Sequence, residues 1–248
     1  MLASFFAWNT RYSKALEKRF NWETDQPFWE EFSQLVASAA SAVQADGVVV
    51  DIGGGRRCIW IDAVPNRVHV VAVDIDPDEL AANPDVEDCR VGDVSKGLPL
   101  AESEADLIVS RALLEHVDGV PDAVRFMARA LKPGGRTLHL VPARYSLFGL
   151  AARLGPFQTL RNLLHLAKPE SKGQVEFPVF YDHCTATDLT EAFRNTGFRT
   201  VNVRVCYAQS NYFYAVIPLF LVVTAYQYAI KLLGVRRLAA YLIVDATR

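Results

Sequence analysis

The feature that most constrains the fold is a series of short, β-branched apolar runs that each end in a polar or glycine-rich turn. The run VVVDIGGG ends at Gly53 to Gly55, and residues 68–73 (VHVVAV) end at Asp74. Continuous apolar runs of this length are typical of strands covered on both faces, as they are in a parallel sheet. The sequence therefore predicts an α/β fold in which parallel strands are joined by right-handed crossovers.

Further predicted helices and strands alternate along the rest of the chain. Apolar residues three and four apart predict helices, and short β-branched runs bounded by turn residues predict strands. The turn Lys132 to Gly135 separates a helix from the strand that follows it. We expect helical structure over residues 7–42, where Asp25 and Pro27 indicate a helix start, and helices over 118–131 and 185–196. Strands are expected over residues 88–91, 106–109, 136–141, 198–205 and 238–244.

Composition excludes several classes of protein. Hydrophobic residues make up 51 % of the 248 residues and charged residues 22 %, which supplies a full core and excludes disorder. The formal net charge of −2 gives no electrostatic case for nucleic acid, since neutralising many phosphates needs a basic surplus. The first apolar run is too short for a signal peptide. We therefore expect a cytoplasmic protein without a nucleic-acid partner.

Metal and disulfide chemistry are also not indicated. The four cysteines are widely spaced, with no C-x-x-C pair, and such thiols are usually reduced in a cytosolic protein. No spacing of His, Asp and Glu residues suggests a metal site. His69, His139 and His165 are interpreted as structural, as is Asp106 at the start of its strand.

The glycine turn predicts a ligand site, because glycines after a buried strand let the backbone approach a ligand closely. Asp74 follows roughly twenty residues later, the range expected of a carboxylate that binds a ribose. Cys58 stands where a nicotinamide fingerprint needs its third glycine, and the absence of G-K-[ST] excludes a P-loop. Asp51, just before the glycines, is a poor neighbour for a pyrophosphate and a good one for a cation.

Five motifs, in this order and spacing, resemble those of class I S-adenosylmethionine-dependent methyltransferases. They are VVVDIGGG, VAVDIDP, VGDVSKGLPL, ADLIVSRALLEHV and ALKPGGRTLHLV, within residues 46–141. The L-E-H-V sequence is most similar to the ubiquinone-biosynthesis-type branch. The resemblance implies S-adenosyl-L-methionine as cofactor and a Rossmann-like, seven-stranded, mostly parallel sheet. It also implies an antiparallel last strand, helices on both faces and inserted helical segments.

The resemblance also implies that residues 1–248 form one domain whose successive segments have different roles. A helical segment precedes a cofactor-binding half, an acceptor-site insertion interrupts the chain, and the second half of the sheet contains an apolar helical insertion. The helical segment is residues 1–45 and the cofactor-binding half is residues 46–141. The acceptor-site insertion is residues 142–184, and the second half of the sheet is residues 185–248, with the apolar insertion at 207–235.

Cofactor-binding roles follow from the resemblance, residue by residue. The loop beside the methionine part of the cofactor corresponds to Asp51, Gly53 and Gly55. Asp74 corresponds to the carboxylate on the ribose hydroxyls, and Ile75 to the apolar contact with adenine.

Two further pairs complete the cofactor site that the resemblance implies. Asp93 corresponds to the residue near the adenine amino group, with Val94 beside it. Ser110 and Arg111 end the fourth strand, where the sulfonium is expected. All of these positions follow the carboxyl ends of predicted parallel strands, where open α/β sheets bind ligands.

Two histidines are candidates for catalysis. His116 follows the fourth strand and suits general-base work near neutral pH, or it packs under the cofactor as a helix residue. Glu115 is a weaker candidate. His183 lies in Tyr181-Asp182-His183, where Asp182 orients it or where the three residues form only a capped, solvated turn. Arg144 and Tyr145 are candidates for the wall of an acceptor pocket.

The leading hypothesis is therefore O-methylation of a hydroxyl on a sugar, a glycolipid or a secondary metabolite. The flanks, including FPVFYDHCT, look like those of methyltransferases from bacterial polysaccharide and lipid pathways. The alternative is a non-catalytic protein that keeps the fold as a membrane-surface or partner-binding module. A nicotinamide oxidoreductase is disfavoured by the missing glycine.

The apolar stretch of residues 212–232 is long enough to suggest a membrane span. Its place between two neighbouring strands argues against a span, as does Pro218 within it. Two interpretations stay open: a buried or dimer-forming helix after a bend at Pro218, or a helix in the membrane surface with Lys231, Arg236 and Arg237 at the headgroups.

Overall fold

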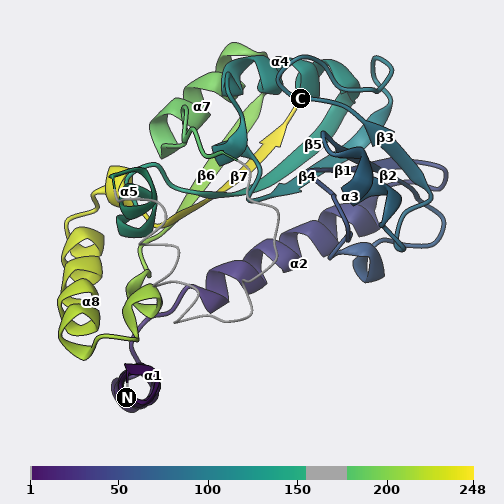
Figure 1. Ribbon diagram of the computed structural model, residues 1–248. Coiled ribbons are helices and arrows are strands. Elements are labelled where there is room, and N and C mark those ends of the chain that lie inside the picture. Colours follow the sequence, from purple (N-terminus) through teal and green to yellow (C-terminus); the bar gives the residue numbers. More distant parts are fainter. Residues whose placement is uncertain (1, 155–177) are drawn as a thin grey trace.

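The computed structural model describes residues 2–154 and 178–248 and contains one seven-stranded sheet, in the order β3-β2-β1-β4-β5-β7-β6 (Figure 1). β1 to β5 run parallel, whereas β7 is antiparallel to both of its neighbours, β5 and β6. This confirms the predicted Rossmann-like fold class. The strands are β1 (Val48–Ile52), β2 (His69–Asp74), β3 (Asp88–Val91), β4 (Ala105–Arg111), β5 (Leu131–Pro142), β6 (Thr200–Cys206) and β7 (Tyr241–Thr247).

Helices cover both faces of this sheet, with α2 on one face and α4 and α7 on the other (Figure 1). The α-helices are α1 (Leu2–Phe20), α2 (Gln26–Ala42), α3 (Pro77–Ala81), α4 (Val120–Ala130), α5 (Leu147–Leu154), α7 (Ala186–Asn195) and α8 (Ile217–Leu232). Short 3₁₀ helices are η1 (Ile61–Ala63), η2 (Leu114–His116), η4 (Ser210–Phe213) and η5 (Arg236–Leu238).

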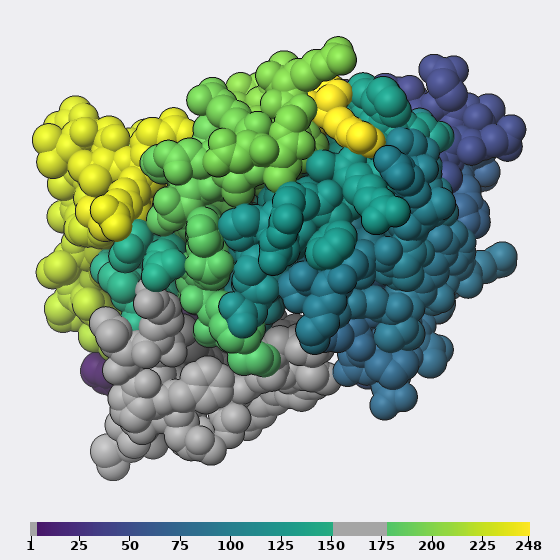
Figure 2. Space-filling view, turned by 90° about the horizontal axis from the view of Figure 1, so that it is seen from above, coloured from purple at the N-terminus to yellow at the C-terminus, as the bar shows by residue number. Residues whose placement is uncertain are grey.

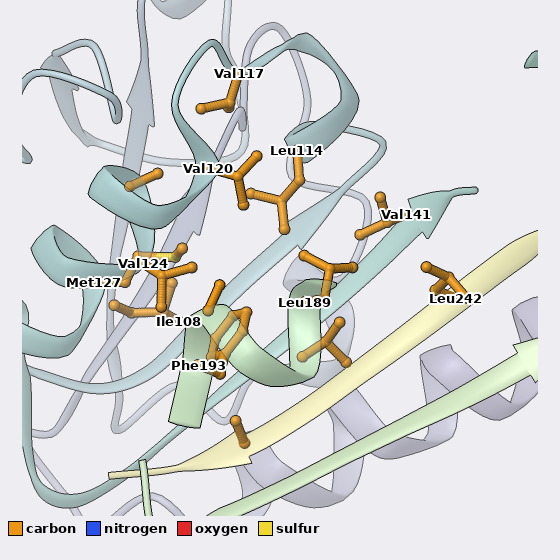
Figure 3. Packing of buried hydrophobic residues seen from close by; sticks show 14 of the residues in the cluster. Ile108, Leu114, Val117, Val120, Val124, Met127, Val141, Leu189, Phe193 and Leu242 are labelled. Atoms are coloured by element: carbon orange, nitrogen blue, oxygen red, sulfur yellow. The ribbon is translucent and has the colours of Figure 1, made fainter. Parts of the chain in front are cut away.

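Each face of the sheet has its own hydrophobic core. On one face, Val124 of α4 and Leu189 and Phe193 of α7 meet over Ile108 of β4 (Figure 3). On the other face, the apolar stripe of α2 packs against Val49, Leu107 and neighbouring residues of the sheet. Because the central strands are covered on both sides, their sequences are continuous apolar runs.

Several boundaries differ from the predictions. β5 begins at Leu131 and so includes the predicted turn Lys132 to Gly135, where its pairing with β4 is irregular. The helical segment predicted over residues 7–42 is two helices, because Asn21 has a left-handed backbone (φ 49°), and α2 begins at the predicted start, with Asp25 as its N-cap residue and Pro27 in its first turn. The last strand was predicted over residues 238–244 but spans Tyr241–Thr247, because Asp245 pairs with Arg136 of β5 across the sheet. A polar residue in a strand is satisfied there by a cross-strand charge.

The apolar stretch of residues 212–232 forms η4 and then α8, which begins at Ile217. Pro218 lies in the first turn of α8, where the missing N–H costs no hydrogen bond. α8 packs against α1 and η4. Within residues 2–154 and 178–248, no helix is both long and apolar enough to cross a membrane.

Candidate cofactor and acceptor site

A cavity of about 640 Å³ opens at the carboxyl ends of the parallel strands. Its walls come from the ends of β1, β2 and β4, from the segments that follow β2 and β3, from η2, and from the chain that returns at Pro178 and Phe180. The predicted site residues in these walls are Gly53, Asp74, Ile75, Asp93, Val94, Arg111 and His116. Residues that are far apart in the sequence therefore meet in one place.

The turn after β1 forms the floor of this cavity. Gly53 has a positive φ of 74° that favours glycine, and its N–H donates to the carbonyl of Val73 at 2.7 Å. Asp51 lies beneath the turn and is buried, which raises the pKa of its carboxyl group to about 8 against the opposing influence of the Cys58 hydrogen bond and the Arg111 charge. Asp51 supports the turn from below and does not line the cavity.

Asp74 is fixed in the wall by two backbone hydrogen bonds. One carboxylate oxygen accepts from the N–H of Gly55 at 3.0 Å, and the other accepts from the N–H of Asp76 at 3.0 Å. Gly55 therefore contributes to the site indirectly, because its N–H holds the Asp74 carboxylate in place. Beside it, the Ile75 side chain is 53 % exposed although it is apolar. An oriented carboxylate next to an open apolar surface suits a ligand with hydroxyl groups beside a flat ring.

The segment after β3 supplies a second fixed carboxylate. Asp93 accepts hydrogen bonds from the backbone N–H of Ser95 at 2.9 Å and from its hydroxyl at 2.6 Å, and Lys96 lies 2.9 Å away. These hydrogen bonds lower the pKa of Asp93. Val94 contributes an apolar side chain to the same wall.

The two predicted site residues at the end of β4 have different positions, since Arg111 lies in the cavity wall and Ser110 lies in the core. Arg111 lines the cavity and also lies over the ring of Trp29, 5.8 Å from its centre. The Ser110 hydroxyl instead lies 2.7 Å from Nδ1 of His139, whose Nε2 is 2.6 Å from the Thr137 hydroxyl. Because Ser110 is fully buried in this network, it is not brought into the cavity.

The histidines interpreted as structural have different positions. Burial lowers the pKa of His139 to about 3, so its imidazole is neutral in the core, as expected of a structural residue. His69 forms an exposed pair with Asp88. The interpretation of His165 lies outside the described residues.

His116 lies in the cavity wall at the end of η2. Its Nδ1 is 2.9 Å from the carbonyl oxygen of Pro178, and since a carbonyl only accepts, Nδ1 carries a hydrogen. The backbone N–H groups of Phe180 and Tyr181 donate to the carbonyl of Glu115 at 2.8 and 3.0 Å. These bonds attach the returning chain to η2, so Pro178 and Phe180 face the ligand space beside His116.

His183 is not brought together with His116. It lies outside the cavity wall, in the turn before α7, with a left-handed backbone (φ 52°). Its Nδ1 is 2.7 Å from a carboxylate oxygen of Asp182, within ion-pair distance but not aligned for a hydrogen bond.

Glu115 has more unusual surroundings than the sequence indicated. Its side chain is 3 % exposed, and burial raises the pKa of its carboxyl group to about 8. Within the described parts of the chain, its Oε2 has no hydrogen-bond partner, while Oε1 lies 3.8 Å from Nε2 of His116. No spacing rule predicts such burial, because the returning chain that covers Glu115 lies more than sixty residues further on.

Arg144 and Tyr145 do not line the cavity. Arg144 donates to the carbonyl of Tyr181 at 3.1 Å, and the Tyr145 hydroxyl accepts from Arg237 at 3.0 Å. Sequence reasoning missed Leu113, Pro178 and Phe180 as wall residues. Pro178 and Phe180 lie in the predicted acceptor-site insertion, residues 142–184, but no spacing singled them out within it.

The sheet and this cavity define the class of the protein. Parallel strands β1 to β5, followed by the antiparallel pair β7 and β6, form the class I methyltransferase fold, with the ligand site at the carboxyl ends of the strands. The chain matches the methyltransferase-domain family over residues 22–203 and belongs to that family. Its fold and family are those of S-adenosylmethionine-dependent methyltransferases.

A curated relative and several solved structures are similar to the chain. It is 33 % identical over 92 residues to the biotin biosynthesis bifunctional protein BioHC of Cellvibrio japonicus, a match that covers 36 % of the chain and 18 % of that protein. The structure resembles the YcgJ protein of Bacillus subtilis at 16 % identity, with a TM-score of 0.51 and coverage of 88 % and 98 %.

Two structural neighbours carry named activities. Geranyl diphosphate C-methyltransferase of Streptomyces coelicolor has a TM-score of 0.56 at 14 % identity, with coverage of 87 % of the chain and 76 % of its own. Phosphoethanolamine N-methyltransferase 2 of Haemonchus contortus has a TM-score of 0.52 at 14 % identity, with coverage of 89 % and 52 %, so the chain spans about half of it. These likenesses concern the fold, and the two named activities differ in the atom that is methylated.

Proposed function

We propose that the chain methylates a hydroxyl oxygen on a small acceptor, namely a sugar, a glycolipid or a secondary metabolite. The observation that carries this proposal is His116 in the cavity wall, with its Nδ1 hydrogen directed to the Pro178 carbonyl. A hydroxyl is a weak nucleophile and gains from a nearby base, whereas a neutral amine already has its lone pair. We also propose the ubiquinone-biosynthesis-type branch, on the L-E-H-V sequence that contains His116.

The residues present fit the cofactor. Asp74 presents a carboxylate that its own backbone neighbours orient, and it would accept hydrogen bonds from the ribose hydroxyls. Ile75 and Val94 would offer apolar contacts to an adenine, and Asp93 would accept a hydrogen bond from its amino group. When bound, the cofactor supplies a sulfonium-activated methyl group and leaves as a neutral thioether once the acceptor oxygen has taken the methyl.

His116 would take the acceptor proton. In the neutral imidazole, the hydrogen on Nδ1 leaves the lone pair on Nε2, so the hydroxyl proton would pass to Nε2 as the oxygen attacks. Phe180 and Pro178 would hold the acceptor against this wall and exclude water from it. Positioning of the oxygen would supply much of the remaining rate.

The proposal is tested with purified full-length protein, labelled donor and a panel of hydroxyl, amine and carbon acceptors. We expect product formation only with hydroxyl acceptors, with the label in an alkali-stable methyl ether. We expect His116→Gln to lower kcat by about 10²-fold while leaving donor affinity unchanged. Transfer to nitrogen or carbon, or unchanged kcat in the variant, would contradict the proposal.

The non-catalytic alternative predicts a different pattern. A protein that only kept the fold would show neither donor turnover nor a change on replacing His116. Calorimetry with S-adenosylhomocysteine separates the two further, because an enzyme is expected to bind this product at micromolar concentration. No heat under those conditions would favour the alternative.

A further inference from the structure

Helix α1 buries polar side chains and exposes aromatic ones. Its small polar residues Asn9 and Ser13 are buried against the η4–α8 segment, whereas the aromatic rings of Phe5, Trp8 and Tyr12 point outward. The Ser13 hydroxyl donates to the carbonyl of Tyr214 at 3.0 Å, and the backbone N–H of Ile217 donates to the Asn9 side chain at 3.1 Å. Hydrogen bonds therefore attach the helix, and its aromatic stripe, with spacings of three and four residues, stays uncovered.

α8 buries Phe220, Val223 and Ile230 and, beside them, two polar side chains. Thr224 and Gln227 are buried, and Gln227 accepts hydrogen bonds from two backbone N–H groups at 3.0 Å. Its outward side chains are mostly apolar, with Tyr228 and Lys231 also exposed, and Leu232 is 89 % exposed. We name the outward residues of the two helices the inverted surface; they are Phe5, Trp8, Tyr12, Leu219, Val222 and Leu232.

The inverted surface lies at one end of the molecule. α1 contacts α8, and Figures 1 and 2 both place α8 at the end opposite to β2 and β3. A monomer rarely exposes so many large apolar side chains in one region without a binding role.

Charge indicates what kind of partner covers this end. α1 carries a surplus of three positive charges, from Arg11, Lys14, Lys18 and Arg19 against Glu17. Glu17 is directed inward, where its carboxylate accepts from the Tyr214 hydroxyl at 2.6 Å. Arg11 and Lys18 are exposed and two helical turns apart, so they share a face beside the aromatic stripe. A second copy of the chain would bring the same positive charge against itself.

We propose that the inverted surface docks on an anionic phospholipid bilayer, with α1 and α8 lying in the headgroup region. Aromatic and aliphatic side chains next to exposed basic ones are the combination that binds such an interface. The 16 residues of α8 lie on the bilayer rather than across it. This inference is independent of the acceptor atom in the proposed function.

Flotation of the full chain with vesicles tests the proposal. We expect binding to vesicles of phosphatidylglycerol and phosphatidylcholine that weakens as salt rises, and little binding to phosphatidylcholine alone. The double variant Phe5→Asp, Trp8→Asp should lower the bound fraction by about ten-fold or more. Ile59→Asp is the matched control, since Ile59 and Trp8 are both 52 % exposed, and it should bind as the wild type does.

A second measurement does not depend on the double variant folding. Brominated lipids should quench the tryptophan fluorescence of the wild type, and Trp8→Phe, which keeps an aromatic ring, should bind vesicles but lose that quenching. Absence of vesicle binding at low salt would overturn the proposal. So would an equal bound fraction in the double variant, or a wild-type dimer that the double variant dissociates without any flotation.

Discussion

The two buried carboxyl groups at the site, Asp51 and Glu115, differ in how they are supported. The Cys58 hydrogen bond and the Arg111 charge both favour the ionised form of Asp51, whereas Oε2 of Glu115 has no described partner. Both pKa values are raised to about 8 by burial. A group whose pKa is raised in the folded state stabilises the fold fully only below its ordinary pKa, and that contribution is lost as the pH approaches the folded value.

Glu115→Gln should therefore change how stability depends on pH. The ordinary pKa of the group is 4.5 and its folded pKa is about 8, so the wild type loses stability between these values. We expect the variant to unfold with a free energy similar to the wild type near pH 4.5 and on the order of 2 kcal/mol higher at pH 8. Urea denaturation across this range measures the difference.

The control for this prediction is Glu87→Gln, which makes the same chemical change at an exposed position. Its unfolding free energy should follow the wild type at every pH. A difference between Glu115→Gln and wild type that does not vary with pH would mean that Glu115 is ionised in the folded protein.

Asp74→Ala should weaken donor binding severely, because Asp74 would accept the ribose hydroxyls and also holds the N–H of Gly55. Hydrogen bonds to a charged group contribute about 1.5–3 kcal/mol each, so we expect a loss of affinity of about 10²-fold by calorimetry. Asp78→Ala, an exposed residue of α3, should bind as the wild type does. Unchanged affinity in Asp74→Ala would place the ribose elsewhere.

At this scale the sequence predicted which strand ends carry the site but not which way each side chain points. Asp74, Ile75, Asp93 and Arg111 line the cavity as predicted. Ser110, one residue before Arg111, points into the core because successive side chains of a strand alternate between faces. Its hydrogen-bond partner His139 comes from the neighbouring strand β5, and no local sequence pattern predicts that hydrogen bond.

At the scale of elements, buried polar side chains hold the apolar segment in place. Gln227 of α8 accepts from the backbone N–H groups of Gln209 and Ser210 and donates to the carbonyl of Glu23 at 3.1 Å. One side chain therefore joins α8, η4 and the link between α1 and α2. This explains how a segment long enough to suggest a span packs as a short helix against the domain.

Gln227→Leu should destabilise the protein by about 2–4 kcal/mol, since it leaves two buried backbone donors and one acceptor unsatisfied. Thermal unfolding followed by circular dichroism measures the loss. Gln34→Leu makes the same substitution on an exposed position of α2 and should change stability by less than about 0.5 kcal/mol. Equal effects of the two variants would show that the hydrogen bonds of Gln227 contribute little.

Element boundaries were predicted less well than elements themselves. Asp25 and Pro27 predicted where α2 begins, but no residue type predicted that α1 ends before Asn21, whose left-handed backbone separates the two helices. The cores also depend on partners that the sequence does not pair, such as Phe193 of α7 against Ile108 of β4 (Figure 3). The inversion of α1 was not predicted, because hydrophobic spacing alone does not show which face is covered.

For the whole molecule, donor binding should couple to global stability, since the cavity walls come from β1, β2, β4 and the chain that returns after β5. A ligand at 100 times its dissociation constant stabilises the folded state by about 2.7 kcal/mol. We expect S-adenosylhomocysteine to raise Tm by a few degrees and adenosine triphosphate to leave it unchanged, by differential scanning fluorimetry. A Tm that does not respond to the thioether would contradict the cofactor assignment of this cavity.

The insertion of β7 between β5 and β6 has a consequence for synthesis on the ribosome. β6 is made before β7 but is hydrogen-bonded only to β7 in the sheet order, so its backbone groups wait for a strand that emerges later. β2 to β5, in contrast, each find one neighbouring strand already made. During translation, the nascent chain therefore carries an unpaired edge at β5 and an unpaired strand at β6, which are the positions where chaperones and pairing errors compete until β7 fills the gap.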